Sequence, residues 1–346
     1  MKLHFCKEKL VELNGDAILF LADQNRFWIT EFQSSAGAVV IMKSKIHAFL
    51  DGRYFEKAKL QFKDTSIKLH EFQGIASVSK FLEAEGIENL LIENDYMVVT
   101  NYLFLKQHIK NLIPFNSKEL RIVKTPKELD SMTFAAKIAT EAMEWLKYEI
   151  KPGMTEKDVA IMATTKMMQL GAEKNSFDPI VASGYNGAFP HHQPTDKVIV
   201  EGEYITVDMG CIYEGYCSDL TRTFPIGNPQ SDEMSKIYQV VLEANKAGIK
   251  AVKAGIKGSK LDKITRDVIE AAGYGEFFNH STGHGVGIDV HEFPNVAKNY
   301  TKPIPAGSVI TIEPGIYVPG LGGVRIEDDI YVSEQGYIVL TSSSSK

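Results

Sequence analysis

Four acidic residues in the second half of the chain lie within or at the ends of apolar, β-branched segments. Asp208 follows Tyr-Ile-Thr-Val, Glu313 follows Val-Ile-Thr-Ile, Glu327 follows Val-Arg-Ile, and Asp219 immediately precedes a Leu-Thr-Arg-Thr run. Such segments predict buried strands. A carboxylate buried there is costly unless a cation pairs with it or it coordinates a metal. Any fold for this chain must therefore provide partners for these four charges.

The first alternative is that the four carboxylates form salt bridges. A single buried acid is more often paired with a basic side chain than with a metal, but only Arg222 and Arg325 are near these four in sequence. Together the four carry enough charge to balance two divalent cations, and without cations they would repel one another and hold protons. Oxygen ligands plus an imidazole suit Mn²⁺, Co²⁺, Zn²⁺ or Fe²⁺, and the ligand types do not choose among these ions.

Histidines are the next candidates for such a site. His191 and His192 form one pair, and His280, His284 and His291 surround a glycine-rich run. This run lacks the full dinucleotide fingerprint and a helical pattern after it, so it does not predict a phosphate site. For those histidines that are not ligands, the alternative is an ordinary hydrogen-bonded structural side chain.

Length and composition limit the remaining possibilities. A chain of 346 residues is long enough for two domains, and 44% hydrophobic with 24% charged residues is typical of a globular protein. The formal net charge is −6 with no long basic run, so we expect neither nucleic acid nor a membrane as partner. No recognisable signal peptide and only three cysteines lead us to expect a reducing, cytoplasmic location.

The first third alternates short apolar runs with helical patterns. Residues 17–21, 38–42 and 89–93 read as buried strands, and residues 53–62 and 75–85 read as helices. This alternation predicts a small α/β domain. The pattern changes near residue 120, so we expect domains at 1–122 and 123–346.

The second domain reads as helix, helix, strands, helix, helix, strands, which suggests two halves of similar build. Pro126 is a plausible first helical residue, and Thr155 with Asp158 resembles a capping box. The expected helices and strands are, in chain order, helices 131–150 and one starting after 155, strands 204–209 and 219–224, helices 231–254 and 260–272, and strands 309–313 and 324–332.

The ordered set Asp208, Asp219, His284, Glu313 and Glu327 resembles the five-ligand dimetal signature of the pita-bread metallopeptidases of the M24B group. The first domain, with its Asp-Gly-Arg-Tyr run at 51–54, is similar to that of the aminopeptidase P and prolidase branch, and methionine aminopeptidases usually lack it. The resemblance implies an α/β creatinase-like N-terminal domain and an α+β pita-bread catalytic domain. The strings that carry it are Val207–Gly210, Ser218–Thr223, Gly283–Gly287, Ile312–Gly315 and Arg325–Asp329.

The resemblance also implies roles for the five ligands. Asp208 would bind one metal, His284 and Glu313 the other, and Asp219 and Glu327 would bridge the two. We expect two divalent ions per chain, with Mn²⁺ first and Co²⁺, Zn²⁺ or Fe²⁺ as alternatives. Metal binding lowers the pKa of water towards neutrality, so the pair would supply the attacking nucleophile. Glu313 would also help to move a proton.

Five further residues match positions around the family's reacting carbonyl. By this resemblance, His191 and His291 donate hydrogen bonds as charge develops on the carbonyl oxygen. His280 would form part of the proline pocket, and Tyr317 and Arg325 would support the ligands and bind substrate.

The expected substrates are peptides with proline in the second position. Aminopeptidase P removes the residue before that proline from longer peptides, whereas prolidase cleaves Xaa-Pro dipeptides. Some prolidases carry an arginine where this chain has Asn295, which favours the aminopeptidase. His191 is a better match than His192 because it directly follows a proline. A non-catalytic binding protein of the same fold is disfavoured because all five ligand positions are intact, and we expect a homodimer.

Overall fold

The computed structural model describes residues 1–43 and 45–346. The chain divides into two compact units, Met1–Leu120 and Arg121–Lys346. Among the residues described, no helix is both long enough and apolar enough to cross a bilayer.

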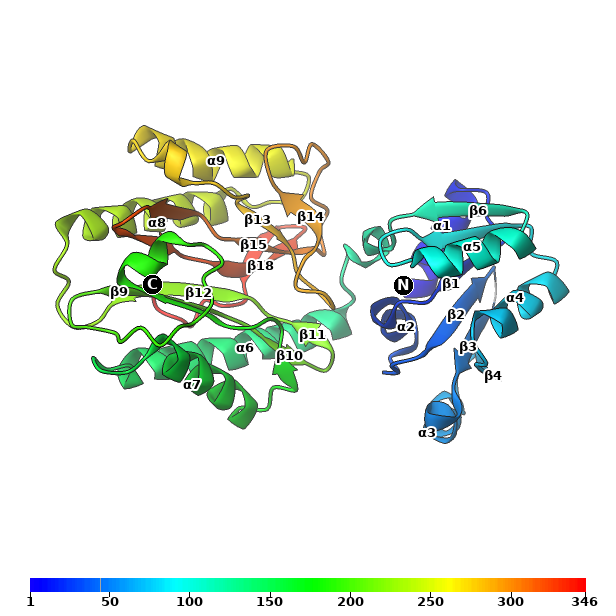
Figure 1. Ribbon diagram of the computed structural model, residues 1–346. Helices are drawn as coiled ribbons and strands as arrows, with labels where there is room; N and C mark the ends of the chain where they lie inside the picture. Colours follow the sequence, from blue (N-terminus) through cyan, green and yellow to red (C-terminus); the bar gives the residue numbers. More distant parts are fainter. Residues whose placement is uncertain (44) are drawn as a thin grey trace. The chain divides into compact units, whose positions relative to one another are not determined.

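The first unit is a mixed six-stranded sheet with helices packed against it, in the strand order β4-β3-β2-β1-β5-β6 (Figure 1). The central strand β1 is fully buried, as expected for a sheet covered on both faces. The predicted α/β architecture is confirmed. The elements are α1 (Lys2–Glu12), β1 (Ala17–Phe20), α2 (Asp23–Thr30), β2 (Gly37–Met42), β3 (Ile46–Leu50), α3 (Gly52–Phe62), β4 (Ile67–Glu71), α4 (Ile75–Ala84), β5 (Asn89–Glu93), α5 (Val99–His108) and β6 (Asn111–Phe115), followed by the 3₁₀ helix η1 (Ser117–Arg121).

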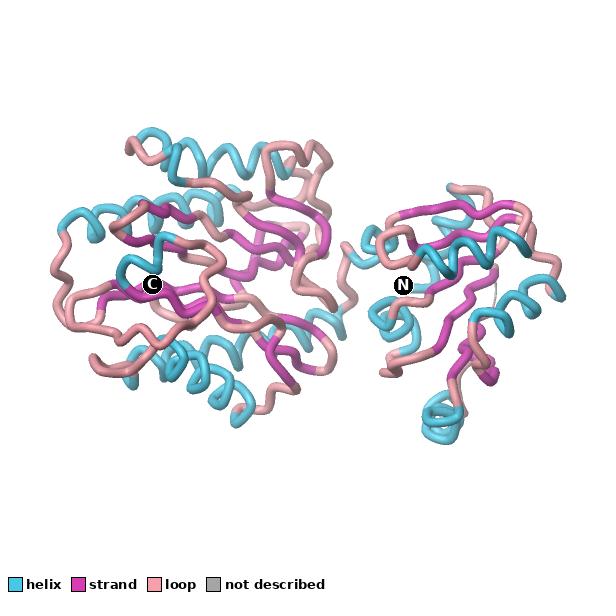
Figure 2. Tube along the Cα trace, viewed as in Figure 1, coloured by secondary structure: helices cyan, strands magenta, loops and turns pink. Residues whose placement is uncertain are grey.

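The second unit has two helix pairs with strands between them. Figures 1 and 2 show α6 and α7 along one side and α8 and α9 along the other. The elements are α6 (Pro126–Glu149), α7 (Glu156–Gln169), β7 (Lys174–Asn175), β8 (Ile180–Ser183), η2 (Gly184–Ala188), β9 (Tyr204–Met209), β10 (Cys211–Tyr213), β11 (Tyr216–Cys217), β12 (Leu220–Pro225), α8 (Asp232–Ala251), α9 (Gly258–Ala271), η3 (Gly275–Phe277), β13 (Gly283–Gly285), β14 (Glu292–Val296), β15 (Val309–Ile312), β16 (Gly315–Val318), β17 (Gly322–Arg325), β18 (Asp328–Ser333) and β19 (Gly336–Val339).

Local sequence explains how the first helix pair begins. The hydroxyl of Thr125 accepts a hydrogen bond from the backbone N–H of Glu128, and the Glu128 carboxylate accepts one from the backbone N–H of Thr125. Pro126 occupies the first turn. Thr155 and Asp158 form the same reciprocal capping box at the start of α7. These caps satisfy amide groups that a helix start otherwise leaves without partners.

The two halves of this unit repeat one order of elements. In each, a helix pair precedes antiparallel strands, in the sheets β12-β9-β8 and β14-β13-β15-β18-β19. The start of the second helix in each pair also makes an isolated bridge to a later segment, Thr155 with Val198 and Lys257 with Pro303. The similar build suggested by the sequence is therefore visible in the topology.

One predicted strand is wrong. Residues 324–332 do not form a single strand, because β17 ends at Arg325 and β18 begins at Asp328. β17 pairs with β16, whereas β18 pairs with β15 and β19, so the chain changes sheets at Ile326 and Glu327. The residues on both sides of the break are buried, from Val324 to Ile330, so burial did not reveal where the strand ends.

Candidate active site

A pocket of about 780 Å³ lies within the second unit. This volume is in the range that accommodates small ligands and short peptides. All ten residues expected to act in the site line it, namely His191, Asp208, Asp219, His280, His284, His291, Glu313, Tyr317, Arg325 and Glu327.

The strands bring the four acids together at their ends. Asp208 lies near the end of β9 and pairs in register with Thr221 on β12, while Asp219 immediately precedes β12. Glu313 immediately follows β15, and Glu327 immediately precedes β18, which pairs with β15. We call Asp208, Asp219, Glu313 and Glu327 the carboxylate cluster.

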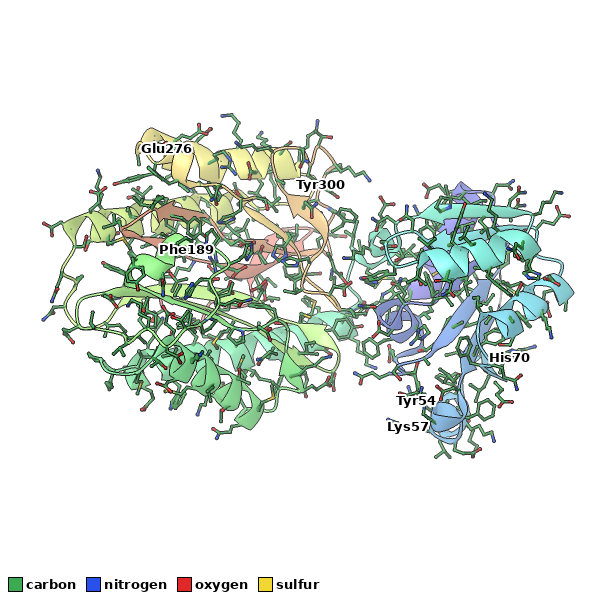
Figure 3. The ribbon with its side chains drawn as sticks, in the orientation of Figure 1. Tyr54, Lys57, His70, Phe189, Glu276 and Tyr300 are labelled. Carbon is green, nitrogen blue, oxygen red and sulfur yellow. The ribbon has the colours of Figure 1, made fainter. Side chains whose placement is uncertain are left out.

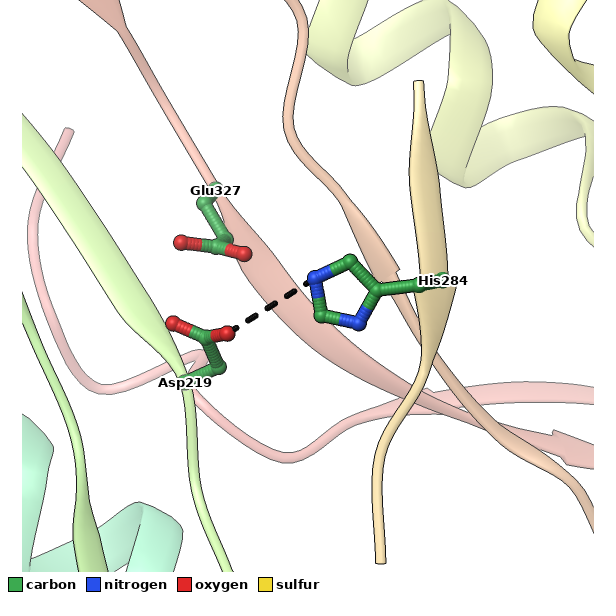
Figure 4. A group of neighbouring side chains, drawn as sticks. All are labelled: Asp219, His284 and Glu327. Atoms are coloured by element: carbon green, nitrogen blue, oxygen red, sulfur yellow. Dashed lines mark ion pairs between the residues drawn. The ribbon is translucent and has the colours of Figure 1, made fainter. Parts of the chain in front are cut away.

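Three side chains of the site lie within reach of one ion. Asp219, His284 and Glu327 each offer a ligand atom, and these atoms lie within 4.8 Å of one another. Figure 4 shows the three side chains pointing towards one another from separate segments of the chain. Nε2 of His284 lies 3.8 Å from Oδ2 of Asp219. The same Nε2 lies 3.2 Å from Oε1 of Glu313.

Two glycines explain how His284 reaches this position. A Cβ atom on Gly283 would lie 2.1 Å from the carbonyl oxygen of Thr311, and one on Gly285 would lie 2.3 Å from that of Phe293. Either contact is impossible for a side chain, so the neighbouring strands can approach β13 this closely only at glycine. The glycines at 283 and 285 therefore allow β15 and β14 to pack closely against β13.

The cluster has too few protein cations for its charge. Burial and the nearby carboxylates Glu327 and Asp208 raise the pKa of Asp219 well above its ordinary value. Burial, Glu313 and Asp208 likewise raise the pKa of Glu327. Oδ1 of Asp208 is buried and has no hydrogen-bond partner among the described residues. Carboxylates with an imidazole are suitable ligands for divalent metals, so the residues fit such ions.

Glu313 differs from the other acids of the cluster because it lies within hydrogen-bond distance of His284. Burial raises its pKa, but the hydrogen bond and charge of His284 outweigh that effect and hold the pKa at about 2. Thr311 links the two residues, since its hydroxyl accepts from the backbone N–H of His284 and donates to Glu313. Glu313 is thus held ionised beside the imidazole.

A chain of hydrogen bonds connects the pocket wall to the cluster. Nε2 of His280 lies 2.9 Å from the hydroxyl of Tyr317, and Nη1 of Arg325 donates to that hydroxyl at 2.9 Å. Nη2 of Arg325 donates to Oδ2 of Asp208 at 2.6 Å. The nearby Arg222 instead pairs with Asp328, so it does not neutralise the cluster side chains. Arg325 therefore orients Asp208, as a second layer around a metal ligand would.

The two candidate catalytic histidines lie at the pocket surface. The ring of His291 packs edge-on against the ring of His284, with 4.4 Å between centroids. His191 is exposed on the loop between β8 and β9. Its neighbour His192 is largely buried, and its Nε2 lies 2.8 Å from Oε2 of Glu156.

Sequence reasoning missed two residues that hold metal-site side chains in place, Asp329 and Thr221. Asp329 accepts the backbone N–H of Asp219 at 2.9 Å, and Thr221 donates to Oε2 of Glu327 at 2.7 Å. Burial raises the pKa of Asp329 to about 7, although that hydrogen bond from Asp219 opposes the rise. Both residues belong to strings that carry the resemblance, so their proximity to the ligands was the available signal.

Comparison with known proteins identifies the family. Residues 130–334 match metallopeptidase family M24, and residues 3–123 match the creatinase/prolidase N-terminal domain. The chain belongs to metallopeptidase family M24. At the level of the family, this chain is therefore a hydrolase that acts on peptides. Membership of the family also implies that it uses divalent metal ions. The expected combination of a creatinase-like domain and a pita-bread catalytic domain is confirmed.

Relatives of this M24 chain have two kinds of name. A putative Xaa-Pro aminopeptidase of Mycoplasma genitalium is 45% identical over 99% of this chain and 97% of that protein. An Xaa-Pro dipeptidase of Pyrococcus furiosus is 38% identical over 97% of each. The solved structure of an Xaa-Pro dipeptidase from Bacillus anthracis has a TM-score of 0.94 and 40% identity, covering 100% of this chain and 98% of that one. The comparisons therefore do not separate the two activities.

Proposed function

We propose that this chain removes the N-terminal residue from peptides whose second residue is proline. Asp208 would bind one divalent metal, His284 and Glu313 the other, and Asp219 and Glu327 would bridge them. Bound metals would provide a water whose pKa is near neutrality. The fit of the carboxylate cluster to cations and the family membership support this assignment.

The surrounding residues have separate tasks in this proposal. His191 and His291 donate hydrogen bonds to the carbonyl oxygen of the scissile bond as negative charge develops there. His280 contributes to the wall that receives the proline ring, which needs no hydrogen bond to its nitrogen. Tyr317 and Arg325 keep Asp208 and the pocket wall in position, as their hydrogen bonds suggest.

The choice of an aminopeptidase rests on the lack of an uncommitted lysine or arginine at the pocket. Among the described residues lining it, Arg325 is the only lysine or arginine. Its guanidinium already donates to Thr221, Pro190, Tyr317 and Asp208. A dipeptide ending in proline presents a carboxylate that needs a cation, whereas a longer peptide does not. The neutral Asn295, which also lines the pocket, fits the longer peptide.

The second candidate is an Xaa-Pro dipeptidase, favoured by the likeness to the dipeptidases of Bacillus anthracis and Pyrococcus furiosus. Assay of the metal-loaded protein on matched Xaa-Pro-Yaa, Xaa-Pro and Xaa-Ala-Yaa peptides separates the possibilities. We expect tripeptides to be cleaved before proline at least as efficiently as dipeptides, and alanine analogues to be poor substrates. Cleavage of dipeptides alone would identify a prolidase, and equal cleavage of alanine analogues would remove the proline preference.

Asn295→Arg tests the carboxylate argument directly. The added cation should raise the ratio of dipeptide to tripeptide kcat/KM by about tenfold, the effect of one charge-assisted hydrogen bond. Asn295→Gln has a longer amide side chain without charge and should leave the ratio near that of the wild type. An unchanged ratio in Asn295→Arg would show that residue 295 does not contact the end of the substrate.

We also propose Mn²⁺ as the native ion, a homodimer as the assembly and the cytoplasm as the location. The three buried free cysteines suit a reducing compartment. Elemental analysis of protein purified without added metal and light scattering in solution test the first two statements, and fractionation of cells tests the third.

A further inference from the structure

Glu156, the first residue of α7, is a buried acid outside the pocket. Each of its carboxylate oxygens accepts three hydrogen bonds. Oε1 accepts from the backbone and hydroxyl of Ser183 and from Nδ2 of Asn186, at 2.8, 3.0 and 3.0 Å. Oε2 accepts from Nε2 of His192 and from the backbone and hydroxyl of Thr195, at 2.8, 3.1 and 2.7 Å. The Glu156 side chain thus holds four residues of the segment 183–195 by hydrogen bonds.

These donors keep the Glu156 carboxylate ionised. Burial raises the pKa of Glu156, but the hydrogen bonds of Asn186, Ser183, Thr195 and His192 outweigh it and hold the pKa at about 2. An ionised carboxylate can only accept, so Nε2 of His192 carries the hydrogen in this contact. A hydrogen bond to a charged acceptor is also stronger than one between neutral groups.

The segment held in this way forms one wall of the pocket. Residues 190–194 all line it. The carbonyl oxygen of Pro190 accepts from Nη1 of Arg325 at 3.3 Å, and His192 donates to Glu156. His191 therefore lies between two anchored residues, although its own side chain is exposed. Phe189, labelled in Figure 3, comes just before this wall and is 59% exposed.

We infer that Glu156, acting through His192, is a positioning residue that sets the location of His191 beside the reacting carbonyl. This inference rests on the proposed function, in which His191 is a hydrogen-bond donor to the substrate. Arg325 fixes the residue before His191 and Glu156 fixes the residue after it. Loss of the Glu156 contact would leave His191 tethered on one side only, without removing any proposed metal ligand.

Substitutions at His192 test this with little disturbance of the buried acid. His192→Phe keeps a ring but removes the donor, whereas His192→Gln keeps an N–H at the end of a flexible side chain. We expect His192→Phe to lower kcat by roughly 10- to 100-fold, since misplacing a group by about 1 Å costs that much. His192→Gln should recover most of the loss. Metal content, measured by elemental analysis, should stay at the wild-type value in both variants.

The matched control is His108→Phe. His108 forms the corresponding kind of pair with Glu83, at 3.0 Å, in the first unit. The His108→Phe variant should have the kcat and KM of the wild type. Wild-type kcat in His192→Phe, loss of metal from it, or equal damage in His192→Gln would each overturn the inference. So would a fall in activity that merely follows the fraction of unfolded protein.

Hydrogen exchange keeps the test independent of the substrate assignment. Amides of residues 184–195 should exchange faster in His192→Phe than in the wild type or His192→Gln, because the loop loses an anchor. Failure of the wild type to cleave any Xaa-Pro peptide would defeat the proposed function, yet the exchange rates would still report on the anchor. Unchanged exchange in His192→Phe would overturn the anchoring role itself.

Discussion

Glu156 and Asp219 are both buried carboxylates of the second unit, but their surroundings are opposite. Glu156 is met by donors on both oxygens and its pKa is held at about 2. Asp219 faces Glu327 and Asp208, and its pKa is raised well above the ordinary value. A carboxylate satisfied by protein donors can act as a structural anchor, whereas a repelling cluster needs cations from outside. Burial alone does not distinguish these two uses.

Substitutions in the carboxylate cluster and at Glu156 should differ most in their effects on activity and metal content. Asp219→Asn or Glu327→Gln should abolish turnover and reduce bound metal, because each is a proposed bridge between two ions. Elemental analysis and peptide hydrolysis measure both effects. Glu156→Gln should keep its metal, and Asp267→Asn, at an exposed position on α9, serves as the charge-matched control. Two metals per chain with near-normal turnover in either bridge variant would contradict the assignment.

His291→Ala separates a pocket residue from a metal ligand. Turnover should fall by on the order of 10²-fold, the effect of losing one donor to the developing oxyanion. Metal should remain bound, since His291 contacts His284 by ring packing and is not a proposed ligand. The measurements are steady-state kinetics and elemental analysis on the same preparation. Metal loss would instead identify His291 as a ligand.

Acid stability tests the Glu156 side of the comparison. Its folded pKa of about 2 is below the ordinary 4.5, so its stabilising effect is fully present above pH 4.5 and is lost as pH falls towards 2. The effect is at most about 3 kcal/mol, the value of that shift before solvent screening reduces it. Glu156→Gln should be less stable than the wild type at pH 7, and the difference should shrink below pH 4.5. Denaturant unfolding across this range measures it, and a constant difference would contradict the assignment.

The smallest expected effect is on thermal stability. Glu156→Gln should destabilise the protein, whereas Asp219→Asn should stabilise it when no metal is bound. In the presence of a chelator, Asp219→Asn should raise the unfolding midpoint by about 2–4 °C for each kcal/mol of repulsion removed. Added metal should then stabilise this variant less than the wild type. Thermal unfolding with and without metal checks both statements. A lower midpoint than the wild type in chelator would mean that the cluster is stable without cations.

Much of the fold could be predicted from local patterns. β9 covers the predicted residues 204–209, Pro126 is the first residue of α6, and the predicted capping box of Thr155 and Asp158 lies at the start of α7. The site could be predicted for a similar reason, because its expected residues occur in short sequence strings with distinctive spacing. The functional roles of these residues stay predictions, although one pocket contains all of them.

The sequence by itself determined most strand and helix positions and indicated that Asp208, Asp219 and Glu327 would be buried, because periodicity and capping depend on neighbouring residues. Only the tertiary structure decided how each buried charge is satisfied. The donors to Glu156 are 27 to 39 residues away, and Arg325 is 117 residues from Asp208. It also decided that residues 324–332 divide between two sheets, since strand pairing depends on distant partners. Local composition reports burial, but the partners of a buried charge depend on contacts that folding alone creates.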